Sequence, residues 1–323
     1  MFEKLIEQIN AAEKIAIFNH EHPDGDAFGS AYGLKLMLCG MGKQAEVFLR
    51  EGDENSREYK LLKGTERCGL RIEDCDLKIA VDCAEKSRLG ALEDSFCGTT
   101  AAIDHHVTHK SFADVTVVVP SAPAAGEIVF DLVRAIGAEL TADIANNLYL
   151  AIICDTGSFK YSSTTPKSHA AAAELMKTGI DFAEISKKIF DTKSFSYLHA
   201  YKKGIECLEM YSDGKIALLA FTNDDFASLG IDEKQADAIV TLPACVEGVE
   251  VGIYMRQRGE NEFKVSLRSN GSANVAEIAM SFGGGGHVRA AGFTVYRPLD
   301  EAKREVIAAI AAVLGEHRGD TEK

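Results

Sequence analysis

Histidines and aspartates follow short apolar stretches at four places in this chain. They are the loop from His20 to Asp26, Asp82, the run Asp104-His105-His106, and Asp155. An isolated aspartate after a strand is usually a helix cap or a turn residue, and an isolated histidine is usually structural. Four such coincidences in one chain instead predict a single shared site for metal ions.

The predicted site draws its ligands from several elements of one sheet. We expect His20, Asp82 and His105 to follow parallel strands, and ligands gather beyond the carboxyl ends of such strands. The four carboxylates would repel each other and resist ionising together, and two divalent cations would offset their charge. Mixed imidazole and carboxylate ligands favour Mn²⁺ over Mg²⁺. The predicted metal ligands are His20, Asp24, Asp26, Asp82, His105 and Asp155.

Strands alternate with helices in the first half of the chain. Strands are predicted near residues 14–19, 45–49, 77–81, 100–103 and 115–119, and helices near residues 2–13, 27–39, 123–136, 141–153 and from Thr165-Pro166 onward. The apolar, branched strands are typical of a sheet covered on both faces. This alternation predicts an α/β domain with a doubly wound, mostly parallel sheet.

The pattern changes near residue 182, where helical spacing continues with more charge, as expected for a linker. Beyond it, strands are predicted near residues 216–221, 249–255, 263–268 and 291–295, and helices near 233–240, 275–281 and 299–315. We therefore expect an N-terminal domain at residues 1–185, a helical linker at 186–212 and a smaller α/β domain at 213–323.

Four consecutive glycines precede a histidine in the second domain. Such a run lets a ligand approach the backbone, and successive N–H groups can bind an anion, although a flexible turn is the alternative. Arg268 can bind a phosphate through two hydrogen bonds, unless it is a solvated strand end. We expect Arg256 and Arg258 to be surface residues. The predicted substrate contacts are Arg268, Gly284, Gly285, Gly286, His287 and Arg289.

Composition narrows the class of protein. A chain of 323 residues can form two domains, and its net charge of −14 argues against coating long duplex nucleic acid. No apolar run approaches the ~20 residues that span a bilayer, and the start lacks the pattern of a signal peptide. The eight cysteines include no Cys-x-x-Cys pair, which favours free thiols. We therefore expect a cytoplasmic protein without a membrane partner.

The motifs together resemble the DHH phosphoesterase superfamily. The matching residues are His20-x-x-x-Asp24-x-Asp26, Asp82, Asp104-His105-His106 and Asp155, in this order. The segment Ser266-Leu267-Arg268-Ser269 and the glycine run ending at His287 resemble the DHH-associated C-terminal domain of the subgroup with nanoRNases and pAp phosphatases. The resemblance covers nearly the whole chain. Residues 1–185 would then be the catalytic domain and residues 213–323 the substrate-binding domain.

The resemblance also implies roles for the individual residues. One metal would be held by His20, Asp24 and Asp82, and the other by Asp26, Asp82, His105 and Asp155, so that Asp82 bridges them. His106 would contact the reacting phosphate, and Asp104 would orient the histidines. One departure is His109, because relatives often carry Asn at this position.

The leading hypothesis is a manganese-dependent phosphoesterase that hydrolyses short oligoribonucleotides to mononucleotides and also pAp to AMP. One alternative is hydrolysis of linear or cyclic dinucleotides, and another is a non-catalytic nucleotide-binding protein on the same scaffold. Loss of a ligand would favour the last, yet all six predicted positions are filled. The expected partners are short RNA, dinucleotides and pAp, and a homodimer remains open.

Overall fold

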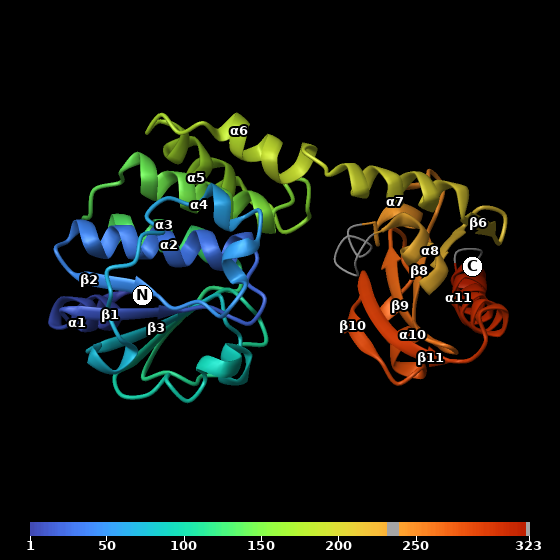
Figure 1. The fold of residues 1–323 in the computed structure, drawn as a ribbon, viewed down its shortest axis with the longest axis horizontal. Coiled ribbons are helices and arrows are strands. Elements are labelled where there is room, and N and C mark those ends of the chain that lie inside the picture. Colours follow the sequence, from blue (N-terminus) through green and yellow to red (C-terminus); the bar gives the residue numbers. More distant parts are fainter. Residues whose placement is uncertain (231–238, 321–323) are drawn as a thin grey trace. The chain divides into compact units, whose positions relative to one another are not determined.

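The computed structural model describes residues 1–230 and 239–320 of the chain (Figure 1). The chain divides into two compact units, Met1–Thr192 and Lys193–Lys323, and each is described by itself. Within the described residues, no helix is long and apolar enough to cross a membrane. All eight cysteines lie in the described part and are free thiols.

The first unit is built on a parallel sheet, as the sequence predicts. Its strands are β1 (Lys14–Phe18), β2 (Gln44–Val47), β3 (Leu77–Val81), β4 (Thr100–Asp104) and β5 (Val115–Val118), in the spatial order β2-β1-β3-β4-β5. Every neighbouring pair is parallel. The carboxyl ends of all five strands therefore lie along one edge, where the histidines and aspartates follow.

The helices of this unit are α1 (Glu3–Ala11), α2 (Gly25–Gly40), α3 (Ala125–Ile136), α4 (Ala142–Asp155), α5 (Pro166–Met176) and α6 (Phe182–Ser186). Helices α2, α3 and α4 lie together on one side of the sheet (Figure 1). Alternate strand residues such as Ile15 and Ile79 pack in this helical layer. Ala16 and Ala80 point to the other face, which packs with Phe96 in a smaller core of loops and short 3₁₀ turns.

Close packing between α2 and α4 brings two of the predicted ligands near each other. Three glycines of α2 face α4, namely Gly25, Gly29 and Gly33. A Cβ added to Gly25 would lie 2.1 Å from Sγ of Cys154, and one added to Gly29 would lie 2.3 Å from the carbonyl oxygen of Asn147. Because the glycines have no side chain, the two helices can approach closely. Asp26, in the first turn of α2, can therefore lie near Asp155 at the end of α4.

Local signals define several helix ends. Asp24 caps α2 by accepting hydrogen bonds from the backbone N–H groups of Asp26 and Ala27. Thr165 forms the N-cap of α5 with Pro166 in the first turn, as predicted, and Ser168 completes a capping box. These interactions fix where the loops that carry site residues begin and end.

The second unit contains a mixed six-stranded sheet. Its strands are β6 (Leu208–Tyr211), β7 (Ile216–Phe221), β8 (Val251–Gly259), β9 (Glu262–Ser269), β10 (Gly285–His287) and β11 (Ala290–Tyr296), in the order β10-β11-β9-β8-β7-β6. Only β7 and β8 pair in parallel among these described strands. The helices are α7 (Phe195–Glu206), α8 (Asn223–Leu229), α10 (Val275–Ser281) and α11 (Leu299–Asp320).

The structure bears on three sequence expectations for this unit. The helix expected at residues 233–240 lies, except for its last two residues, outside the described residues. The interpretation of Arg256 as a surface residue is wrong, because it is 2% exposed on β8. The expectation for Arg258 fits the structure, in which this residue is exposed.

Candidate metal centre

Three loops at the carboxyl edge of the parallel sheet converge on Asp82. Nε2 of His20, after β1, lies 3.6 Å from Oδ2 of Asp82, and Nε2 of His105, after β4, lies 3.4 Å from Oδ1. The same His105 nitrogen lies 3.3 Å from Oδ2 of Asp155 and 3.8 Å from Oδ2 of Asp26. Donor atoms held about 2.1 Å from one cation lie roughly 3.0–3.4 Å apart, so the spacings of His105 Nε2 from Asp82 and Asp155 suit a shared ion, and the other two are slightly longer.

The structure groups all six predicted ligands into overlapping clusters. The potential metal-binding groups are His20, Asp24 and Asp82; Asp26, His105 and Asp155; and Asp82, Asp104, His105 and His106. In each group the possible ligand atoms lie within 4.8 Å of one another. His20 of the first group approaches Oδ2 of Asp82, and His105 of the second approaches Oδ1. Exposed His22, by contrast, joins none of these groups among the described residues.

Asp82 has the features of a metal-binding carboxylate. It is 2% exposed, and its buried Oδ1 has no hydrogen-bond donor within the part of the chain that the structure describes. A buried carboxylate oxygen without a partner is costly, and a cation would satisfy it. The backbone of Asp82 is left-handed, with φ of +57°. Such strain often occurs at functional sites, and here it turns the side chain between the loops.

Asp26 is held by the first turn of α3. Its Oδ2 accepts a hydrogen bond of 2.6 Å from the N–H of Ala125. Its Oδ1 accepts bonds of 2.9 Å from the N–H of Gly126 and 2.8 Å from the hydroxyl of Ser30. The carboxylate is fully buried, so these bonds fix its orientation toward His105 before any cation binds.

The raised pKa values of several groups in the site reflect its excess of negative charge. Burial, followed by the charges of Asp24 and Asp82, raises the pKa of Asp155 from 3.8 to about 7. Burial also raises the pKa of Asp26, with the charges of Asp82 and Asp155 adding to it. For His105, burial lowers the pKa but the carboxylates outweigh it and raise the pKa to about 10. Without a cation, these groups therefore hold protons that a metal would displace.

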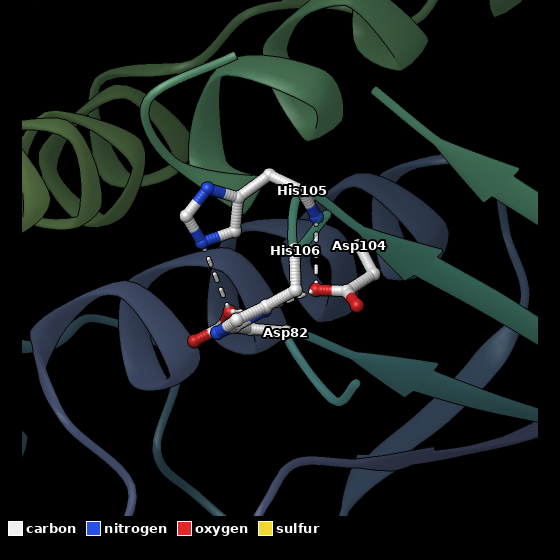
Figure 2. Close-up of side chains that lie close together, drawn as sticks. All are labelled: Asp82, Asp104, His105 and His106. Atoms are coloured by element: carbon white, nitrogen blue, oxygen red, sulfur yellow. Dashed lines mark hydrogen bonds and ion pairs between the residues drawn. The ribbon is translucent and has the colours of Figure 1, made fainter. Parts of the chain in front are cut away.

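Asp104 lies behind the cluster and joins its histidines. This fully buried carboxylate accepts 2.7 Å hydrogen bonds from Nδ1 of His106 at Oδ1 and from Nδ1 of His109 at Oδ2. Oδ1 also accepts the backbone N–H of His105 at 2.8 Å. Figure 2 shows both histidine rings beside the Asp82 carboxylate, with Asp104 next to His106. His106 is therefore held by Asp104 while its ring stays close to the predicted ligands.

Two side chains at the site were missed by the sequence interpretation. His109 was noted as a departure from the family pattern and received no role. Arg50 was not considered, although its guanidinium donates hydrogen bonds of 2.5 Å to the carbonyls of both Asn19 and His20. One signal was available for Arg50, because it follows β2 at the same edge of the sheet. Arg50 braces the loop that carries His20.

The glycine run of the second unit is part of a strand rather than a flexible turn. Gly285 to His287 form β10, which pairs with β11. An added Cβ at Gly284 would lie 2.3 Å from the carbonyl oxygen of Gly292, and one at Gly286 would lie 2.5 Å from Cα of Ala291. These two glycines are therefore required by the close approach to β11.

The remaining predicted substrate residues lie around this strand. Arg268 on β9 pairs in register with Ala290, and its Nη1 donates a 2.9 Å hydrogen bond to the Leu267 carbonyl. Arg289, between β10 and β11, donates to the carbonyl of Gly271. The structure thus gathers Arg268 and the β10 segment at one end of the sheet.

The pKa values predict how metal binding depends on pH. A group whose pKa is raised on folding stabilises the folded, metal-free protein when the pH is below the group's ordinary pKa. This stabilisation is lost as the pH rises through the pKa of the folded state. Asp155 therefore loses its contribution between about pH 4 and 7, and His105 loses its own between about pH 6.5 and 10. Divalent cations bind the ionised carboxylates, so added Mn²⁺ should raise the Tm more at about pH 8 than at about pH 5.5.

Thermal unfolding with and without Mn²⁺ at the two pH values measures this difference. The variant Asp155→Asn is the control, because it removes the carboxylate and should show a smaller pH dependence of the Mn²⁺ effect. A larger Mn²⁺ effect at the lower pH in the unchanged chain would contradict the prediction.

Two family models match the chain. The DHH family, N-terminal domain, matches residues 14–189, and the DHHA1 domain matches residues 214–316. The chain is 34% identical to the bifunctional oligoribonuclease and PAP phosphatase NrnA of Thermus thermophilus, over 92% of this chain and 89% of that protein. It is 25% identical to the protein of the same name from Bacillus subtilis, over 98% and 100% of the two chains.

Two further similarities differ in what they cover. The cyclic-di-AMP phosphodiesterase PdeA of Listeria monocytogenes is 24% identical over 96% of this chain, but this match covers only 49% of PdeA. Among solved structures, an exopolyphosphatase-related protein from Bacteroides fragilis superposes with a TM-score of 0.82 at 24% identity. That match covers 100% of this chain and 97% of the other, and it supports the same two-unit fold.

Proposed function

This chain belongs to the DHH family of phosphoesterases, and from that premise we propose that it hydrolyses short oligoribonucleotides to mononucleotides and pAp to AMP. The observation that carries the proposal is that Asp82 groups with His20 and Asp24 and also lies 3.4 Å from Nε2 of His105, which groups with Asp26 and Asp155. The substrate class rests on similarity to the oligoribonuclease and PAP phosphatase of Thermus thermophilus, which extends over both units. A cytoplasmic location fits such substrates.

We assign six residues to two divalent cations, with Mn²⁺ as the proposed metal. His20, Asp24 and Asp82 would hold one, and Asp26, Asp82, His105 and Asp155 the other, so that Asp82 bridges both. The mixed imidazole and carboxylate donors support this assignment. So does the buried Oδ1 of Asp82, which makes no hydrogen bond among the described residues and lies 3.4 Å from Nε2 of His105. Bound cations of this kind supply Lewis acidity at the phosphate oxygens and make hydroxide available near neutral pH.

The protein's own contribution to the reaction lies with His106 and Asp104. His106 donates from its ring to a phosphate oxygen, or protonates the leaving oxygen, as charge develops there. Asp104 accepts its Nδ1–H, fixes the ring and stabilises the protonated imidazole. Burial alone would raise the pKa of Asp104, but the hydrogen bonds from His106 and His109 outweigh it and lower that pKa. Asp104 therefore stays ionised.

We further propose a division of labour along the chain. Residues 1–185 would carry out the chemistry, residues 186–212 would link the domains, and residues 213–323 would bind the substrate. Arg268, Arg289 and the segment Gly284 to His287 would contact a terminal phosphate. Their gathering at one end of the second sheet supports this role.

The test of the function is hydrolysis of end-labelled dinucleotide pApA, and of pAp, with added Mn²⁺. Both should yield AMP, and a chelator should stop the reaction. Cyclic di-AMP belongs in the same assay because of the similarity to PdeA, and we expect slower cleavage of it than of pApA. Binding of these nucleotides without turnover would favour a non-catalytic protein, and turnover of cyclic di-AMP alone would favour the dinucleotide phosphodiesterase.

Replacing Arg268 by alanine should raise KM more than it changes kcat or metal content. Loss of a hydrogen bond to a charged group costs about 1.5–3 kcal/mol, which predicts a rise of roughly 10-fold or more in KM for pApA. Arg258→Ala is the matched control, because Arg258 is an exposed arginine on the neighbouring strand β8. A loss of bound metal from Arg268→Ala that matches its loss of activity would contradict a role in substrate binding.

A further inference from the structure

The Asp104 carboxylate is clamped between two imidazole rings from the loop after β4. Its Oδ1 accepts Nδ1 of His106, and its Oδ2 accepts Nδ1 of His109, both at 2.7 Å. The carboxylate is 0% exposed. Because each carboxylate oxygen takes one ring, the plane of the carboxylate is set from both sides.

The surroundings of His109 show that its ring is fixed in turn. Its side chain is 3% exposed. The ring lies against Phe112, with centroids 5.3 Å apart and an interplanar angle of 31°. The backbone N–H of His109 donates to the carbonyl of His106 at 3.1 Å, which closes the turn between the two histidines. Nε2 of His109 is buried and has no hydrogen-bond partner among the described residues. Among the described residues, the hydrogen bond from Nδ1 to Asp104 is thus what orients this ring.

This arrangement matters because the terminal torsion of an aspartate is soft. The χ2 angle of aspartate is broadly distributed, so bonds to one oxygen alone leave the carboxylate plane poorly defined. Without a donor on Oδ2, Asp104 would also keep one buried carboxylate oxygen unpaired. Rotation of the carboxylate would relieve this and would move the acceptor away from His106.

We propose that His109 is a positioning residue for His106 and acts through Asp104. Its Nδ1–H anchors Oδ2, so that Oδ1 holds His106 with a proton on Nδ1 and the opposite ring nitrogen directed away from Asp104. The role rests on the proposed phosphoesterase function, in which His106 contacts the reacting phosphate. His109 itself touches neither the substrate nor a cation in this assignment.

Two replacements separate positioning from packing. His109→Leu keeps an apolar side chain beside Phe112 but removes the donor. His109→Asn places an amide nitrogen on Cγ, at the position that Nδ1 occupies in histidine, and so restores a donor to Oδ2. Outer contacts of this kind typically change activity by about 10–100-fold. We expect His109→Leu to lower kcat by about that factor with KM and metal content little changed, and His109→Asn to stay within about 3-fold of the unchanged chain.

The coupling to His106 supplies a second readout. Adding His109→Leu to His106→Ala should cause little further loss, because the two residues act in one chain of contacts. The control is His199→Leu, since the His199 ring also lies against a phenylalanine, Phe195, with centroids 4.3 Å apart, but belongs to the other unit. Additive losses in the double variant, or equal losses in the Leu and Asn variants, would overturn the proposal.

A measurement without activity distinguishes this proposal from the proposed function. ¹⁵N-detected NMR of the histidine rings in the metal-free protein should show His106 protonated at Nδ1. His109→Leu should weaken or shift that signal, and His109→Asn should restore it. An unchanged His106 signal in the Leu variant would contradict the positioning role even if the chain hydrolysed none of the tested substrates. Conversely, a changed signal in an inactive protein would overturn only the function.

Discussion

Replacing Asp82 by asparagine should abolish hydrolysis and remove bound metal from both positions. Asp82 lies in two of the ligand clusters and is 2% exposed, so no water or neighbouring carboxylate can readily replace it. We expect activity to fall by at least about 10³-fold, beyond the roughly 10–100-fold typical of residues that only support a ligand. The measurements are kcat/KM with pApA and metal content per chain after dialysis.

Asparagine is chosen because it removes the charge and can keep the backbone conformation of Asp82. Asp82 has a φ of +57°, and asparagine adopts the left-handed region more readily than most residues. The variant should therefore fold, and circular dichroism would verify this. Asp143→Asn is the matched control, because Asp143 is exposed in the first turn of α4. Two equivalents of metal and undiminished activity in Asp82→Asn would show that the assigned bridge is wrong.

Alanine replacements should separate the two adjacent histidines by their effects. Nδ1 of His105 lies 3.2 Å from the Ala122 carbonyl, which leaves Nε2 directed at the carboxylates. His105→Ala should therefore lower metal content and activity together. The His106 side chain is 33% exposed against 15% for His105, as expected for a residue that meets the substrate. His106→Ala should keep its metal but lose about 10²–10⁴-fold in kcat.

Metal analysis of both variants beside their kinetics provides the comparison. Loss of metal from His106→Ala to the same extent as from His105→Ala would reverse the proposed roles. The variant that combines His105→Ala with His106→Ala serves as a further control. Activity at the wild-type level in this variant would place the reaction elsewhere on the chain.

Much of the first unit could be predicted because its signals are local. Apolar runs such as the one from Leu77 to Val81 mark strands, and Thr165-Pro166 marks a helix start that the structure confirms. A strand that is both apolar and followed by a polar residue also indicates where the carboxyl edge lies. His20, Asp82 and His105 could thus be placed at one edge without knowledge of tertiary contacts.

The second unit was less predictable because its contacts depend on strand pairing. The glycine run gave no indication of a strand, but Gly285 to His287 form one whose partner is β11. Arg256 suggested a surface charge, but it is buried on β8. In both cases the sequence neighbours are uninformative, because pairing and burial are decided by segments far along the chain.

The sequence by itself determined which carboxylates and imidazoles follow strands, and from these it predicts a site for two cations. Only the tertiary structure decided how these groups are held. Asp26 depends on N–H groups about 100 residues away in α3, and the His20 loop depends on Arg50. Asp104 is shared between His106 and His109 through one particular turn. Such contacts require exact distances between side chains, and the residue types alone do not set these distances.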